Sequence, residues 1–66
     1  MIELLVQARR DADITQTELG RRLGKRQTFV SKVELLERRL DAAEFIEMSR
    51  AIGADPYAIM RSAERD

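Results

Sequence analysis

Apolar residues recur along most of the chain with the three-to-four-residue spacing of helices, and polar capping residues divide them into five segments. The predicted helices span residues 2–12, 16–23, 27–35 or slightly beyond, 42–52 and 56–62, with fraying expected near Ser62. No run of alternating β-branched residues occurs, so no strand is predicted. The pattern indicates an all-α fold, in which short connections make neighbouring helices pack at steep angles around one small core.

Several of these boundaries carry specific capping signals. Thr15 and Glu18 have the spacing of a capping box, in which each side chain accepts a hydrogen bond from the other residue's backbone amide. Asp41 and Glu44 repeat that spacing at the start of the fourth predicted helix. Gly24 follows the second predicted helix and can adopt a positive φ at little cost. A tight turn is therefore predicted between the second and third helices.

Apolar side chains on one face of the third and fourth predicted helices form a candidate core. On the fourth helix they follow the i, i+3, i+4, i+7 rule. The residues expected to be buried are Val30 and Val33 on the third helix, and Phe45, Met48, Ser49 and Ile52 on the fourth. The polar face of the third helix is expected to point outward.

The chain has 66 residues, which is the length of one domain. A domain of this size buries only about 60% of the surface that its unfolded chain exposes, so its stability alone is marginal. A second subunit would add stability by mass action. We therefore expect a single domain over residues 1–66.

The formal net charge is zero, with 12 basic and 12 acidic residues, which argues against a non-specific binder of polyanions. The charges are nevertheless unevenly placed. Residues 1–17 carry a net charge of −1, residues 18–39 carry +4 from seven basic and three acidic side chains, and residues 40–66 carry −3. The positive segment coincides with the second and third predicted helices, although charge alone fits an ordinary solvated surface equally well.

The sequence contains neither Cys nor His. Their absence removes disulfides, thiolate nucleophiles, most zinc sites and the usual general base. No Gly-rich phosphate loop is present either. The sequence therefore predicts that the protein is not an enzyme and uses no metal and no cofactor. No apolar run has the length of a signal peptide or a membrane span.

The residues around the second and third predicted helices occur in a specific order. They are Arg9, Thr15-Gln16-x-Glu18-Leu19, Gly20, Leu23-Gly24, Gln27-Thr28-x-Val30-Ser31-Lys32-Val33-Glu34, Arg38-Arg39-Leu40-Asp41 and the helix at 45–53. Over nearly the whole chain this set resembles the Cro/phage-repressor type of helix-turn-helix domain, also called the Xre family. The resemblance implies a compact five-helix phage-repressor-like fold with a helix-turn-helix formed by helices 2 and 3. It also implies sequence-specific binding of double-stranded DNA by a transcription regulator.

The resemblance places Gln27, Thr28 and Lys32 on the face of the third helix that enters the major groove. Their chemistry fits that role, because Gln pairs with N6 and N7 of adenine, Lys with O6 and N7 of guanine, and Thr with thymine. Thr28 and Lys32 are four positions apart and share one helix face, with Gln27 adjacent at the helix start. We expect base contacts from these three residues. Without the resemblance, the same face would be a solvated helix surface.

Contacts with the DNA backbone are expected from polar residues that flank this face. The resemblance implies a phosphate contact from Gln16, in the first turn of the second helix, where free amides attract anions. The other candidates are Lys25, Arg26, Ser31, Arg38 and Arg39.

Three further positions matter for the shape of the domain. Arg9 and Glu34 resemble an ion pair that, in this family, ties the first helix to the end of the third. Such a pair positions the DNA-reading helix and does not itself contact DNA. Gly20 corresponds to the small residue that lets the second and third helices cross closely.

Two positions depart from the family pattern. Leu36 stands where many relatives have the Gly that ends the third helix. A Leu there either adopts a left-handed conformation, at a cost of about 1–2 kcal/mol, or lets the helix run on. We expect the helix to run on, since Glu37 and the two residues after it are good helix formers. Arg26 stands where relatives often have Ser or Thr, which leaves the third helix without a side-chain cap.

The leading interpretation is a cytoplasmic homodimer, nucleoid-associated when bound to DNA, with no membrane partner. Its dimer face is expected on the fifth helix and the loop before it, around Tyr57, Ile59 and Met60, although at least one of Ile59 and Met60 is expected to cover the core. The zero net charge and the acidic last segment leave a second interpretation open. In that interpretation the protein is a protein-binding module, such as the antitoxin of a toxin–antitoxin pair, with DNA binding secondary or absent.

Overall fold

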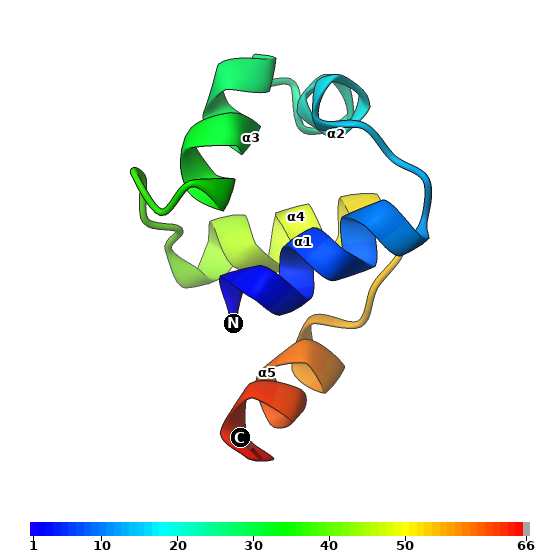
Figure 1. Cartoon of the computed structure of the whole chain (residues 1–66), viewed down its shortest axis with the longest axis vertical. Helices are drawn as coiled ribbons and strands as arrows, with labels where there is room; N and C mark the ends of the chain where they lie inside the picture. The colour runs from blue at the N-terminus through cyan, green and yellow to red at the C-terminus, as the bar shows by residue number, and fades with distance from the viewer. Residues whose placement is uncertain (66) are drawn as a thin grey trace.

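Five helices make up the part of the chain that the computed structural model describes, residues 1–65 (Figure 1). They are α1 (Ile2–Asp11), α2 (Gln16–Leu23), α3 (Gln27–Glu34), α4 (Ala42–Ile52) and α5 (Pro56–Arg65). No strand occurs among these residues, and the predicted all-α fold is confirmed. The expected fraying near Ser62 is wrong, because α5 continues to Arg65.

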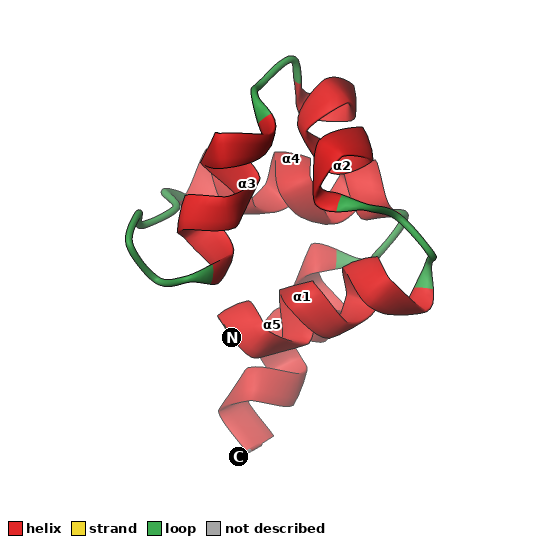
Figure 2. Cartoon of the chain, turned by 45° about the horizontal axis from the view of Figure 1, so that its top comes forward, coloured by secondary structure: helices red, strands yellow, loops and turns green. Residues whose placement is uncertain are grey.

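Helices α1 and α4 pack against each other at the centre of the molecule, with α2 and α3 on one side and α5 on the other (Figure 1). Helix α2 packs on both α3 and α4, while α5 packs on α1 and α4. Figure 2 shows α2 and α3 joined by a tight turn at one extremity of the molecule. The outer side of this helix pair is therefore uncovered by the other described elements. None of the described helices combines the length and the apolar character needed to span a membrane.

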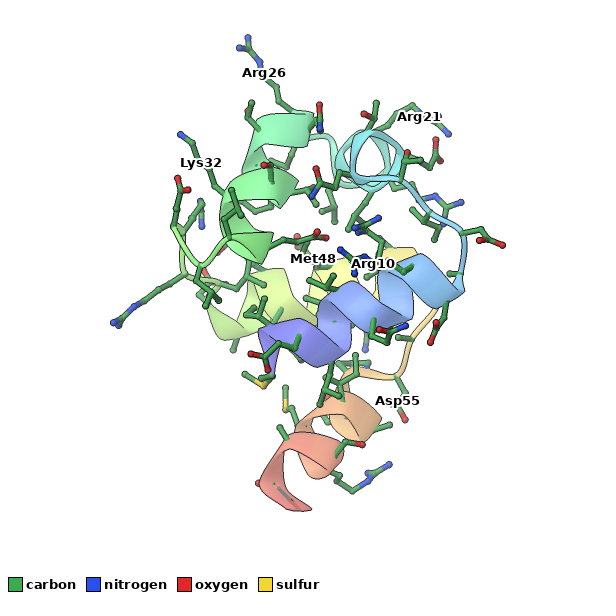
Figure 3. All side chains as sticks on the ribbon, in the orientation of Figure 1. Arg10, Arg21, Arg26, Lys32, Met48 and Asp55 are labelled. Carbon is green, nitrogen blue, oxygen red and sulfur yellow. The ribbon has the colours of Figure 1, made fainter. Side chains whose placement is uncertain are left out.

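All five helices contribute to one apolar core. Its buried side chains are Leu5, Ile14, Leu19, Val30, Val33, Phe45, Met48, Ile52 and Ile59. Ser49 is buried with them and donates its hydroxyl to the backbone oxygen of Phe45 at 2.8 Å, so its polar group is satisfied. Met48 of α4, labelled in Figure 3, is 1% exposed and lies in this core. Every residue expected in the core of α3 and α4 is confirmed, and Ile59 of α5 joins them.

The two predicted capping boxes differ in outcome. At α4 both hydrogen bonds form, from the Glu44 amide to Asp41 Oδ1 at 2.7 Å and from the Asp41 amide to Glu44 Oε1 at 3.1 Å. At α2 only half of the box forms, because Thr15 accepts the Glu18 amide at 3.0 Å but the Glu18 carboxylate turns away. The prediction of a full box at α2 is therefore wrong.

Two arginines on the same helix explain that difference. The Glu18 carboxylate receives hydrogen bonds from Arg21 at 2.6 and 3.0 Å and from Arg22 at 2.9 Å. The hydrogen bonds from Arg21, and to a lesser extent that from Arg22, lower the pKa of Glu18 to about 2. Two charged donors one turn along the helix stabilise the carboxylate more than one neutral amide does.

A close approach of backbones sets the angle between α2 and α3. Gly24 adopts a left-handed φ of 66°, as predicted, and turns the chain directly into α3. A Cβ atom at Gly20 would lie 3.0 Å from the Lys25 carbonyl oxygen and 3.2 Å from the Arg26 carbonyl group. Those neighbours are backbone atoms, so a large side chain at position 20 would push the turn away from α2. The expected role of Gly20 in close crossing agrees with this geometry.

The expectation that α3 runs on through Leu36 is wrong. Leu36 has a left-handed φ of 64°, and α3 ends at Glu34. The amide of Leu36 donates to the Val33 carbonyl at 3.1 Å, and that of Glu37 donates to the Lys32 carbonyl at 2.8 Å. This pair of bonds is a Schellman motif, which satisfies carbonyls that the end of a helix leaves free. The motif stabilises the left-handed residue in spite of its Cβ atom.

Replacing Leu36 by Gly is expected to raise the stability of the monomer, because Gly adopts the left-handed conformation without the cost of about 1–2 kcal/mol that Leu carries. A gain of about 1 kcal/mol corresponds to a rise of about 4–8 °C in melting temperature for a domain of this size. Thermal unfolding followed by circular dichroism at low protein concentration measures it. Leu35→Gly is the matched control: Leu35 is similarly exposed but has φ −85°, so that variant should gain nothing. No rise for Leu36→Gly would contradict the strain assigned to Leu36.

Candidate nucleic-acid interface

The outer face of α3 carries the three side chains expected to contact bases. Val30 and Val33 hold the inner face of the helix against the core, and neither has any exposed surface. The exposed side chains on the outer face include Gln27, Thr28 and Lys32. In Figure 3 the side chain of Lys32 extends away from the body of the molecule, and so does that of Arg26 just before the helix. A polar helix face therefore stands free at one extremity of the domain.

A continuous chain of hydrogen bonds connects α1 to the first residue of α3. Arg9 donates to both carboxylate oxygens of Glu34, at 2.6 and 3.1 Å. Gln16 donates from Nε2 to the same carboxylate at 2.9 Å. Gln27 then donates from Nε2 to Oε1 of Gln16 at 3.2 Å. Gln16 of α2 therefore orients the side chain of Gln27, and the buried carboxylate of Glu34 holds Gln16.

The ion pair of Arg9 and Glu34 is almost completely withdrawn from solvent. Their side chains are only 10% and 9% exposed. Arg9 also donates from Nη1 to the backbone oxygen of Ile14 at 2.7 Å, so the same guanidinium holds the loop between α1 and α2. A planar guanidinium facing both oxygens of a carboxylate is the most directional ion pair that side chains form. The pair therefore fixes the C-terminal end of α3 relative to α1 and to the start of α2.

The N-terminal end of α3 has no side-chain cap. Arg26 occupies the cap position with an extended backbone, at φ −80° and ψ 158°, and its side chain accepts nothing from the first turn. The Phe29 amide donates to the Arg26 carbonyl at 3.0 Å, and the amides of Gln27 and Thr28 stand at the positive end of the helix dipole without a side-chain cap. This arrangement favours a negatively charged group at the start of α3.

The cations expected at the DNA backbone fall into two groups. Lys25, Arg26 and Arg39 are exposed, and none of them takes part in an ion pair among residues 1–65. Arg38 instead forms an ion pair with Glu44, with Nη2 3.0 Å from Oε2. Ser31, the uncharged candidate of the set, is half-buried on α3.

Three contacts of this region have no counterpart in the sequence-based predictions. The half-buried ring of Phe29 lies under two cations, with Lys25 Nζ at 5.6 Å and Arg38 Cζ at 4.7 Å from its centre. Arg22 donates to the backbone oxygen of Ala51 at 2.9 Å and thereby joins α2 to the last turn of α4. The Lys25–Phe29 spacing of four residues is a sequence signal for the first contact, whereas the other two depend on the tertiary fold.

A helix, a tight turn and a second helix with a free outer face define a helix-turn-helix domain, and α2 and α3 have this arrangement. The helix-turn-helix family model matches residues 5–59. A solved structure of an XRE-family like protein from Pseudomonas syringae pv. tomato str. DC3000 is 53% identical to the chain. That similarity covers 97% of this chain and 78% of that chain, with a TM-score of 0.94. No curated protein matches.

The chain belongs to the Cro/C1-type, or XRE, helix-turn-helix family, which is a family of DNA-binding regulators. The resemblance noted from the sequence is confirmed.

Replacing Glu34 by Ala is expected to lower the free energy of unfolding by about 3–5 kcal/mol, because the buried guanidinium of Arg9 loses its partner. Urea unfolding followed by circular dichroism measures the change. Glu37→Ala is the matched control, since Glu37 is exposed and forms no ion pair within the described residues; its effect should stay within about 0.5 kcal/mol. Similar losses for the two variants would mean that the ion pair does not hold α3 in place.

Proposed function

We propose that the protein binds specific sequences of double-stranded DNA as a transcription regulator, with α3 in the major groove. The observation that carries the proposal is the free face of α3, where Gln27, Thr28 and Lys32 are exposed beside an uncapped helix start. The major groove is wide enough to admit a helix with its side chains. Membership of a family of DNA-binding regulators supports the same role.

Each of the three side chains is assigned a base contact by its chemistry. Gln27 gives one N–H group to Gln16, which leaves its carbonyl oxygen and second N–H for N6 and N7 of adenine. Thr28 offers its hydroxyl and methyl groups to thymine, and Lys32 its ammonium group to O6 and N7 of guanine. Thr28 and Lys32 are separated by about 6 Å along the helix axis. They therefore address base pairs about two steps apart.

Contacts with the DNA backbone are assigned to the polar residues at the margin of this face. The residues are Gln16, Lys25, Arg26, Ser31 and Arg39. Gln16 is suited to join the two kinds of contact, because its second N–H group is free while the first holds the Glu34 carboxylate. The first-turn amides of Gln27 and Thr28, which have no side-chain cap, and the cations Lys25 and Arg26 directly before them favour a phosphate group at the start of α3.

Selection of bound duplexes from a random pool tests this function directly. The wild-type protein should enrich one sequence, and its affinity for that sequence should fall as salt rises. Replacing Gln27, Thr28 or Lys32 by Ala should cost about 1–3 kcal/mol each and relax the preference at one base pair. Arg26→Ala should weaken all sequences alike and reduce the salt slope by about one.

Arg61→Ala is the control for these variants, since it removes one exposed positive charge from α5, on the opposite side of α1 and α4 from α3. It should leave both the preference and the salt slope nearly unchanged. A wild-type protein that enriches no sequence, or a triple alanine variant that keeps the same preference, would refute the function.

We also propose that the protein acts as a homodimer whose subunits meet at the loop after α3. Leu35 and Leu36 form an exposed apolar ridge there, with 64% and 70% of their surface in solvent. An apolar groove adjoins the ridge on the same face. Its apolar lining residues are Met1, Ile2, Leu36, Leu40, Ala42, Phe45 and Met60. Of the three α5 residues expected at the dimer face, only Met60 lines this groove, since Tyr57 is exposed outside it and Ile59 lies in the core.

A second copy of the chain is the occupant that fits this face. Because ridge and groove adjoin, a two-fold rotation places each ridge against the groove of the other copy. The charged residues of the loop balance, with Glu37 and Asp41 against Arg38 and Arg39, so two identical faces do not repel each other. The ridge follows the C-terminal end of α3, so Gln27 and Thr28 at the other end of the helix stay away from the two-fold axis.

Sedimentation equilibrium tests the dimer. The wild-type protein should associate weakly, since a small interface gives low affinity, and Leu35→Ser and Leu36→Gly should each weaken association about tenfold or more. Leu36→Gly is informative because it should stabilise the monomer, so lost association is not a folding defect. Tyr57→Ser is the control, since Tyr57 is 55% exposed but lies outside the ridge and groove. Unchanged association in both ridge variants would rule out this face.

A further inference from the structure

An arginine and an aromatic ring link the DNA-facing helix to the start of α4. The guanidinium carbon of Arg38 lies 4.7 Å from the centre of the Phe29 ring, within the range of a cation–π contact. Its Nη1 and Nη2 atoms donate to Oε1 and Oε2 of Glu44 at 3.3 and 3.0 Å. Nη1 also donates to the backbone oxygen of Arg39 at 2.8 Å. Phe29, Arg38 and Glu44 together are called the α3–α4 clamp below.

Glu44 is a fixed anchor for this clamp. Its Oε1 atom accepts the backbone amide of Asp41 at 3.1 Å, and its own amide donates to Asp41 Oδ1 at 2.7 Å. The carboxylate is therefore held by the first turn of α4 as well as by Arg38. Because Phe29 belongs to α3, the stacked guanidinium transmits the position of α4 to α3.

We propose that Arg38 is a positioning residue, which holds α3 in its DNA-reading orientation through Phe29 and does not itself bind a phosphate group. This assignment rests on the proposed function. Phe29 directly follows Thr28 and lies three positions before Lys32, on an adjoining part of the helix surface. A shift of the ring therefore moves both base-contact side chains.

A phosphate contact from Arg38 would require the clamp to open. Three of the five N–H groups of its guanidinium are already bound. Turning them toward DNA would leave the Glu44 charge uncompensated near the DNA backbone and would uncover the Phe29 ring. Lys25 is the useful contrast, because its ammonium lies over the same ring but has no ion pair among residues 1–65. Its charge is available to a phosphate group at little cost.

The salt dependence of binding separates the two roles. The probe is the duplex selected from a random pool with the wild-type protein, and fluorescence anisotropy gives the affinity over a series of salt concentrations. Arg38→Lys keeps the charge but loses the planar fork and the stacking. We expect it to bind about fivefold to tenfold more weakly, with an unchanged salt slope. Lys25→Gln, by contrast, should reduce the slope by about one.

A pair of matched variants on α4 gives an independent test. Glu44→Gln removes an acceptor of the clamp, so it should weaken binding even though it removes a negative charge. Glu47→Gln removes the same charge from an exposed position on α4 outside the clamp and should not weaken binding. In a Phe29→Leu background, Arg38→Lys should cause no further loss, because the two residues act as one unit. Circular dichroism verifies that each variant is folded at the assay temperature.

If Arg38→Lys binds the duplex with wild-type affinity, the positioning role is overturned. It is also overturned if Arg38→Gln reduces the salt slope of binding by about one. Stronger binding by Glu44→Gln than by Glu47→Gln would also overturn it, since that result means that Arg38 is released to bind phosphate. A wild-type protein that selects no duplex contradicts the proposed function and this assignment with it. Binding by the wild type with no effect of Arg38→Lys contradicts the positioning role alone.

Discussion

The buried ion pair between Arg9 and Glu34 is the interaction on which the placement of α3 and its free outer face depends. It joins α1 to the last residue of α3, and the same guanidinium holds the Ile14 carbonyl at the entry to α2. Two charges with this little solvent exposure require each other, because either one alone would be buried without compensation. The Glu34 carboxylate also holds Gln16, and Gln16 holds Gln27. One internal contact therefore sets the angle of α3 and the orientation of its first polar side chain.

The position of α3 also depends on the residues that end the helices. Among the described residues, those with positive φ are Asp13, Gly24, Leu36 and Gly53, each just after a helix. Glycine takes this conformation freely and aspartate tolerates it, whereas leucine is strained in it. The strained residue stands where α3 must end abruptly, so that Arg38 can reach back to Phe29. Local strain in a segment that positions functional side chains is a recurring feature of proteins, and here it also leaves Leu35 and Leu36 exposed.

Most of the fold could be predicted from local sequence signals, because caps, glycines and apolar spacing act over a few residues. Asp41 with Glu44, Gly24 and the buried face of α4 are examples. The errors arise where tertiary contacts compete with a local preference. Leu36 and the residues after it favour a helix, but the Schellman bonds and the path to α4 end it. Glu18 fits a capping box, but two arginines claim its carboxylate. Arg38 resembles a free surface cation, and only the folded chain brings it to Glu44 and Phe29. The exposure of the residues on α3 followed from the pattern, whereas the hydrogen bond between Gln16 and Gln27 did not.

The zero net charge of the chain is a weak argument against binding to a polyanion, because several of its acidic side chains are paired within the fold. Within residues 18–39 the acidic side chains of Glu18 and Glu34 are both bound by arginines, and Glu44 of α4 is bound in the same way. Their charges are compensated inside the domain and contribute little field at the outer face of α3. The cations that have no ion pair in the described chain include Lys25, Arg26, Lys32 and Arg39, in or near α3. Electrostatic attraction to a polyanion depends on such local excess and not on the total. A chain with zero net charge can therefore have a locally positive surface at α3.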